Sequence, residues 1–95
     1  MKLIDTHTHL YVEAFDKDRD EVIKKAIEKG VYRFYLPSIV SSYTIRMLDL
    51  EKRYPDSIRL MMGLHPTYVR ENYKDELSHV HQYLAEHDFA AVGEI

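Results

Sequence analysis

Apolar residues occur along the chain in four short runs, separated by three longer stretches in which apolar and charged positions recur with helical spacing. The runs are residues 3–6, 31–36, 58–62 and 90–92, and they are rich in branched or aromatic side chains. Short runs of this kind, bounded by glycine or proline, are typical of β-strands. The pattern therefore predicts four strands joined by three helices.

The first helical stretch carries the clearest signals. Asp18 with Glu21 three residues later predicts a capping box at the helix start, and Gly30 stands where a left-handed C-terminal cap belongs. The apolar positions that share one helical face are Val22, Ile23, Ala26 and Ile27.

The other two helices are bounded by breakers and polar residues. The second is expected to begin near Ser41 or Ser42 and to end before Pro55. Its apolar positions are Ile45, Met47 and Leu48. The third is expected from about Glu71 to His87, with an apolar face made by Leu77, Val80 and Leu84.

Strands that alternate with helices predict an α/β fold with a parallel sheet, because short crossovers through a helix return the chain in the same direction. The alternation itself is compatible with two architectures. One is a doubly wound sheet, and the other is part of an eight-stranded (β/α)8 barrel of the TIM type. The hydrophobic pattern does not distinguish them.

Histidines follow the first predicted strand at a spacing that suits a metal ion. In an extended segment residues two apart point to the same face, so Asp5, His7 and His9 are expected to project together. Two imidazoles at a strand end form half of a metal site, and a nearby carboxylate can orient one ring. The alternative is that they only mark a strand-to-loop junction.

A second histidine pair, His79 and His81, has the same spacing but lies in the third predicted helix. Residues two apart on a helix point in different directions, so this pair cannot share a metal ion. These two residues and His87 are expected to face solvent.

Two more candidates follow later strands. His65 lies in the turn after the third strand, where Gly63 permits a close backbone approach and Pro66 stiffens the chain. Glu94 follows the fourth strand and would be costly in an apolar setting unless it were paired or bound to a metal. All these residues fall at the carboxyl ends of strands, which is where parallel α/β proteins bind ligands.

Composition narrows the function classes. The 95 residues are 45% hydrophobic and 31% charged, which indicates a globular chain, and the net charge of −3 gives no basic footprint for nucleic acid. Cysteine is absent, which excludes thiolate chemistry. No apolar run approaches the about 20 residues that cross a bilayer, and no secretory leader is recognisable, so a cytoplasmic location is expected.

Three motifs together resemble the TatD-type metal-dependent hydrolases, which are amidohydrolase-like (β/α)8 barrels. They are residues 4–10 (Ile-Asp-Thr-His-Thr-His-Leu), 63–66 (Gly-Leu-His-Pro) and 91–95 (Ala-Val-Gly-Glu-Ile), in that order. The stretch 15–20, Phe-Asp-Lys-Asp-Arg-Asp, also fits the family. The resemblance covers the whole chain.

The resemblance implies a role for each motif. His7 and His9 would bind the first divalent metal, Glu94 would bridge two metals, and His65 would lie near the substrate phosphate. Asp5 would support the metal ligands from behind. The implied activity is hydrolysis of phosphodiester bonds in DNA by a metal-activated water, with one or two ions of Zn, Mn, Mg or Fe.

Such barrels have about 250 residues, so residues 1–95 are expected to form a single N-terminal half-barrel segment with four strands and three helices. The late aspartate and the later histidines of the family would lie outside it, and no catalytic residue is assigned. Activity of this segment alone is therefore uncertain. The chain is expected to associate with itself or with a C-terminal half of the barrel.

Two alternatives stay open. One is another amidohydrolase-like or histidinol-phosphatase-like hydrolase, which shares the first histidine motif. The other is a non-catalytic half-barrel that binds metal or self-assembles.

Overall fold

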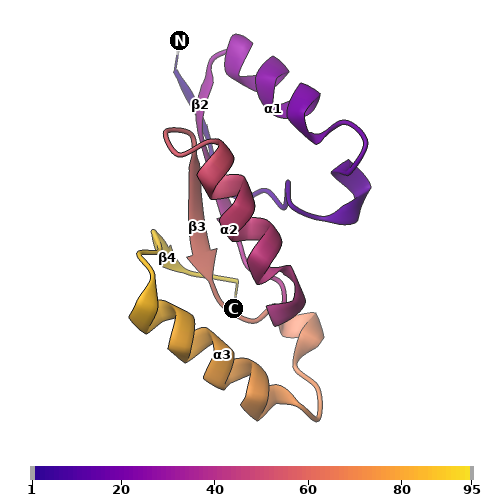
Figure 1. Cartoon of the computed structure of the whole chain (residues 1–95), viewed down its shortest axis with the longest axis vertical. Helices are drawn as coiled ribbons and strands as arrows, with labels where there is room; N and C mark the ends of the chain where they lie inside the picture. The colour runs from indigo at the N-terminus through magenta and orange to yellow at the C-terminus, as the bar shows by residue number, and fades with distance from the viewer. Residues whose placement is uncertain (1, 95) are drawn as a thin grey trace.

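A computed structural model describes residues 2–94 as a curled, four-stranded parallel sheet with three helices (Figure 1). The strands are β1 (Leu3–Asp5), β2 (Val31–Pro37), β3 (Ile58–Met62) and β4 (Ala91–Val92). The helices are α1 (Arg19–Glu28), α2 (Thr44–Arg53) and α3 (Tyr73–Glu86), and short 3₁₀ turns lie at Glu13–Phe15, Ser41–Tyr43 and Pro66–Tyr68. The predicted alternation of strands and helices is confirmed.

The order of the strands in space resolves the choice of architecture. They pair in chain order, β1-β2-β3-β4, and all three pairings are parallel. A doubly wound sheet requires a reversal of strand order, and these four strands have none. The arrangement is a half-barrel, consistent with half of a TIM barrel.

The hydrophobic core lies between the sheet and the first two helices. Along β3 the residues Ile58, Leu60 and Met62 are buried and alternate with partly exposed ones, because successive side chains point to opposite faces. From α1 and α2 the core receives Ile23, Met47 and Leu50. Two residues of the loop after β1, Leu10 and Tyr11, also belong to it, so this loop is anchored in the core.

The ends of α1 agree only in part with the sequence. Gly30 has a φ of 108°, which confirms the left-handed C-terminal turn. Asp18 is at the N-cap, but its side chain makes no capping hydrogen bond, so the predicted capping box is wrong. The first turn is instead organised by Arg19, whose guanidinium donates back to the carbonyl of Leu10.

The apolar face expected for α3 is largely exposed. Leu77 and Leu84 are 52% and 38% exposed, whereas Glu76 is buried. The Glu76 carboxylate accepts hydrogen bonds from the Ser41 amide (3.1 Å) and the Ser41 hydroxyl (2.7 Å). These bonds compensate its burial, and they attach α3 to the turn before α2.

Two histidines that were expected to face solvent also make contacts between helices. His79 Nε2 lies 2.8 Å from Thr44 Oγ1, and His87 Nε2 lies 2.8 Å from Glu51 Oε1. His81 is exposed, as expected. Within residues 2–94, no helix is long and apolar enough to cross a membrane.

Candidate metal centre

Four side chains from three segments meet at the carboxyl end of the sheet. The Nε2 atoms of His7 and His9, in the loop after β1, lie 3.2 and 3.4 Å from Oε1 of Glu94. Nε2 of His65, after β3, lies 3.1 Å from Oε2 of the same carboxylate. The structure thus brings together four of the five residues that the sequence singled out, all except Asp5.

Glu94 is placed by close backbone contacts. Its amide donates to the Ser38 carbonyl (3.1 Å), and the Ser38 amide donates to the carbonyl of Gly93 (3.1 Å). On the other side Gly63 touches the same backbone: a Cβ at this position would stand 2.5 Å from the Glu94 carbonyl oxygen. The close approach predicted for Gly63 is confirmed, and it explains why only glycine fits there.

The contacts of His9 define which nitrogen carries its proton. Nδ1 lies 3.1 Å from the carbonyl oxygen of Pro37 and 3.1 Å from the hydroxyl of Tyr11. That hydroxyl donates its single proton to the Pro37 carbonyl over 2.6 Å, so both partners of Nδ1 are acceptors and Nδ1 is the donor. The lone pair of neutral His9 is therefore on Nε2, as a metal ligand requires.

His65 has the opposite arrangement. Its Nδ1 accepts a hydrogen bond from the backbone amide of Thr67 (3.1 Å) and lies 2.8 Å from the Thr67 hydroxyl. An amide can only donate, so Nδ1 carries the lone pair and the neutral ring has its proton on Nε2. This nitrogen lies 3.1 Å from Oε2 of Glu94, so the protonated side of the His65 ring is the one nearest the carboxylate.

The two oxygens of Glu94 consequently differ. Oε2 lies 3.1 Å from Nε2 of His65, while Oε1 is buried and makes no hydrogen bond among the described residues, although His7 Nε2 lies 3.2 Å from it. Oε1 also lies 3.4 Å from His9 Nε2, which carries a lone pair in the neutral ring, and a proton or a metal cation between these two atoms makes the contact favourable. Ligand atoms of His7, His9 and Glu94 all lie within 4.8 Å of one another. This donor set fits a divalent metal ion.

Burial favours the ligand form of His9. Partial desolvation lowers the pKa of His9 below its ordinary value, and the repulsion from His7 acts in the same direction. Glu94 opposes the shift. A neutral imidazole with a free Nε2 is the state that binds a metal.

Asp5 contacts the backbone of His7 at this site. β1 ends at Asp5, so the extended spacing does not continue to His9. The Asp5 carboxylate accepts a hydrogen bond from the backbone amide of His7 (3.1 Å). The expectation that all three side chains share one extended face stays a prediction, while His7 and His9 converge on Glu94.

Sequence reasoning missed three groups at the site: the Tyr11 hydroxyl, the Pro37 carbonyl and Thr67. The first two are distant along the chain from each other, and a backbone carbonyl leaves no mark in the sequence. Thr67, two residues after His65, offered a local signal, because short polar side chains often bond the residue two positions away.

Comparison with known proteins agrees with this geometry. The model of the family described as TatD related DNase matches residues 4–95. The chain is 34% identical over 102 residues to an uncharacterized metal-dependent hydrolase of Methanocaldococcus jannaschii, and the match covers 100% of the chain and 37% of that protein.

Two further relatives have more specific names. The chain is 31% identical over 93 residues to the 3'-5' ssDNA/RNA exonuclease TatD of Erwinia tasmaniensis, covering 97% of the chain and 36% of that protein. It is 27% identical over 95 residues to a deoxyribonuclease of Homo sapiens, covering 79% of the chain and 35% of that protein. The chain thus spans about a third of the length of these relatives, and it matches their N-terminal part. The chain belongs to the TatD-related DNase family.

Proposed function

We propose that this chain forms the first part of the metal centre of a metal-dependent hydrolase that cleaves phosphodiester bonds in DNA. The observation that carries the proposal is the convergence of His7, His9 and Glu94, whose possible ligand atoms all lie within 4.8 Å of one another. The names of the relatives support the substrate class, since two of them are a deoxyribonuclease and an exonuclease.

In this proposal His7, His9 and Glu94 hold the ion. When bound there, a divalent metal would supply Lewis acidity and lower the pKa of a water molecule. Imidazole and carboxylate ligands suit Zn²⁺, Mn²⁺ or Fe²⁺ better than Mg²⁺, and a second ion would need ligands outside these residues. The bound charge also lets a chain of net charge −3 attract DNA.

His65 and Asp5 have supporting roles. The Nε2 proton of His65 is available to a phosphate oxygen of the substrate, and Thr67 keeps the ring in that form. Asp5 is a positioning residue, because its carboxylate holds the His7 backbone amide.

The metal site is tested by titrating the purified chain with Mn²⁺ and Zn²⁺ in a calorimeter. The wild type is expected to bind one ion, and His9→Ala is expected to lose at least about 100-fold in affinity, since it removes a ligand. His81→Ala is the matched control, because His81 belongs to the second histidine pair and is exposed. Equal affinities for the two variants would contradict the assignment.

The activity is tested with a labelled single-stranded DNA oligonucleotide. Cleavage should require the divalent ion, stop with a chelator and be lost in Glu94→Gln. His65→Gln is expected to reduce cleavage while it leaves metal affinity within about twofold, because its Nε2 proton faces anions. Cleavage that persists in the presence of a chelator would refute a metal-dependent reaction.

A second candidate function is a non-catalytic half-barrel that self-associates. The edge strands β1 and β4 are exposed, and so are Leu77 and Val92, at 52% and 56%. Pairing of β4 of one copy with β1 of another would cover both edges. Metal binding without DNA cleavage, together with a dimer by light scattering, would support this candidate. A monodisperse monomer at high concentration would exclude it.

A further inference from the structure

The loop that carries His7 and His9 is held from behind by one guanidinium. Arg19 Nε donates to the carbonyl of Leu10 (2.6 Å), and its Nη2 donates to those of Tyr11 (3.2 Å) and Val12 (2.7 Å). These are the three residues immediately after His9. One rigid, planar side chain therefore fixes three consecutive carbonyls, and the Arg19 side chain is only 16% exposed.

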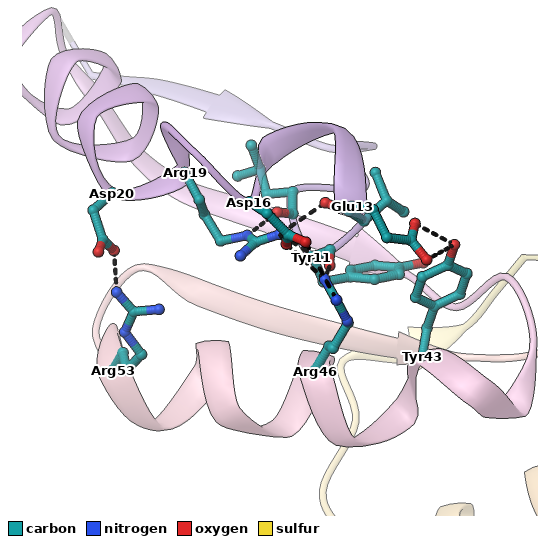
Figure 2. A network of polar contacts seen from close by, with 10 residues as sticks. Tyr11, Glu13, Asp16, Arg19, Asp20, Tyr43, Arg46 and Arg53 are labelled. Carbon is teal, nitrogen blue, oxygen red and sulfur yellow. Dashed lines mark hydrogen bonds and ion pairs between the residues drawn. The ribbon is translucent and has the colours of Figure 1, made fainter.

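A second arginine, from α2, reaches the same place. Arg46 Nη1 donates to the Tyr11 carbonyl (3.1 Å) and to Oδ1 of Asp16 (2.8 Å), and Asp16 Oδ1 also accepts from Arg19 (2.8 Å). Figure 2 shows Asp16 between the two guanidinium groups, with the Tyr11 ring beside them and directed toward Tyr43. The hydrogen bonds from Arg46 and Arg19 lower the pKa of Asp16 to about 2, so it is ionised at neutral pH.

The contacts continue from this cluster to the metal ligand. Tyr11 is 1% exposed, and its hydroxyl contacts both the Pro37 carbonyl and Nδ1 of His9. On the other side, α2 is rigidly seated through the buried residues Met47 and Leu50. A continuous set of contacts thus runs from α2 through Arg46 and the Tyr11 backbone to the ring of His9.

A neighbouring ion pair provides a natural comparison. Arg53 of α2 pairs with Asp20 of α1, which also accepts a hydrogen bond from Tyr54. This pair joins the same two helical segments, as Figure 2 shows, but among the described residues Arg53 makes no bond to the loop backbone after His9. Like the group of Asp16, Arg19 and Arg46, it is an arginine–aspartate ion pair. Unlike that group, it makes no hydrogen bond within residues 2–94 to the loop that carries His9.

We propose that Asp16, Arg19 and Arg46 form a clasp of positioning residues that fixes His9 for metal binding. The clasp holds the loop backbone, and the backbone holds Tyr11 against Nδ1 of His9. This inference rests on the proposed metal site. Among the described residues the clasp donates hydrogen bonds to the loop backbone and not to His7, His9 or Glu94, so its effect on the site is transmitted through the loop.

The test compares Arg46→Gln with the matched control Arg53→Gln. Each variant removes one arginine of an ion pair between α1 or its preceding loop and α2, and both side chains are largely exposed, at 40% and 49%. In calorimetric titration with Mn²⁺, Arg46→Gln is expected to lose about 10-fold in affinity, the cost typical of groups that orient ligands. Arg53→Gln is expected to stay within about twofold. Arg19→Lys, which keeps the charge and loses the planar fork, is expected to behave like Arg46→Gln.

Amide hydrogen exchange in the metal-free protein provides an independent readout. The amides of Thr8 and Val12 flank His9 and bond the carbonyls of Tyr35 and His9. They are expected to exchange faster in Arg46→Gln and at the wild-type rate in Arg53→Gln. If the wild type binds no metal, the proposed function fails. The exchange comparison would still show whether the clasp holds the loop around His9. If the exchange rates of these amides changed equally in Arg46→Gln and Arg53→Gln, or changed in neither, the proposed clasp would be wrong.

Discussion

Replacement of Gly63 by alanine directly tests how Glu94 is positioned. The added Cβ would stand 2.5 Å from the Glu94 carbonyl oxygen, 2.6 Å from the Gly93 carbonyl carbon and 2.8 Å from the Glu94 nitrogen. All three atoms belong to the backbone, which cannot rotate away as a flexible side chain can. Gly63→Ala therefore pushes the segment that carries Glu94 away from β3.

The size of this displacement follows from the contacts. An ordinary van der Waals contact begins near 3.4 Å, so the Glu94 backbone must move by about 0.9 Å. Metal–ligand distances tolerate only about 0.2 Å. A shift of this size takes the carboxylate out of reach of a metal held by His7 and His9, while the overpacking costs about 1–3 kcal/mol of stability.

The assay is Mn²⁺ affinity by calorimetry, with far-UV circular dichroism to verify the fold. Gly63→Ala is expected to lose at least about 10-fold in affinity. Gly93→Ala is the matched control, since its Cβ would meet the nearest atoms, those of Met61 and Pro37, at 3.7–3.8 Å. A folded Gly63→Ala variant with wild-type affinity would refute the argument that this contact positions Glu94.

Three other predictions follow from contacts described above. Glu76→Ala should lower the free energy of unfolding by about 2–3 kcal/mol in urea, because it leaves the Ser41 donors unpaired, while the exposed Asp75→Ala should have little effect. The pKa of Asp16 is depressed in the folded chain, so its stabilising effect is present above about pH 4 and is lost as the pH falls toward 2. Melting temperatures from pH 5 to 2 should thus fall less steeply in Asp16→Asn, and an equal fall would contradict this. Saturating Zn²⁺ should raise the melting temperature and a chelator should reverse the rise, because the ion binds only the folded site.

Much of the fold was predictable because its signals are local. Strand positions follow from short apolar runs, and the turn at Gly30 follows from the residue type, because glycine readily adopts the positive φ that the turn has. The candidate ligands were identifiable because the carboxyl ends of parallel strands meet at one edge. The strand order, however, required the structure or the family resemblance, since a half-barrel and a doubly wound sheet share one sequence pattern.

The errors arose where long-range contacts override local pattern. The apolar positions of α3 do not reveal which of its residues is buried: Leu77 is exposed, and Glu76 is buried because Ser41, far away in sequence, satisfies its carboxylate. Likewise the sequence predicts that His79 faces solvent, but its ring contacts Thr44, which lies far away in the sequence. At the site, the proton positions on His9 and His65 depend on a backbone carbonyl and a backbone amide, and neither can be located from residue identity.

The central claim is that His7, His9 and Glu94 hold one divalent cation. The most direct test is an anomalous difference map from crystals of the chain soaked in Mn²⁺ or Zn²⁺. The account predicts a peak bonded to Nε2 of His7, Nε2 of His9 and the Glu94 carboxylate, with His65 Nε2 directed at a carboxylate or anion instead of the metal. A map with no peak there, or with the ion bound to Nε2 of His65, would contradict it.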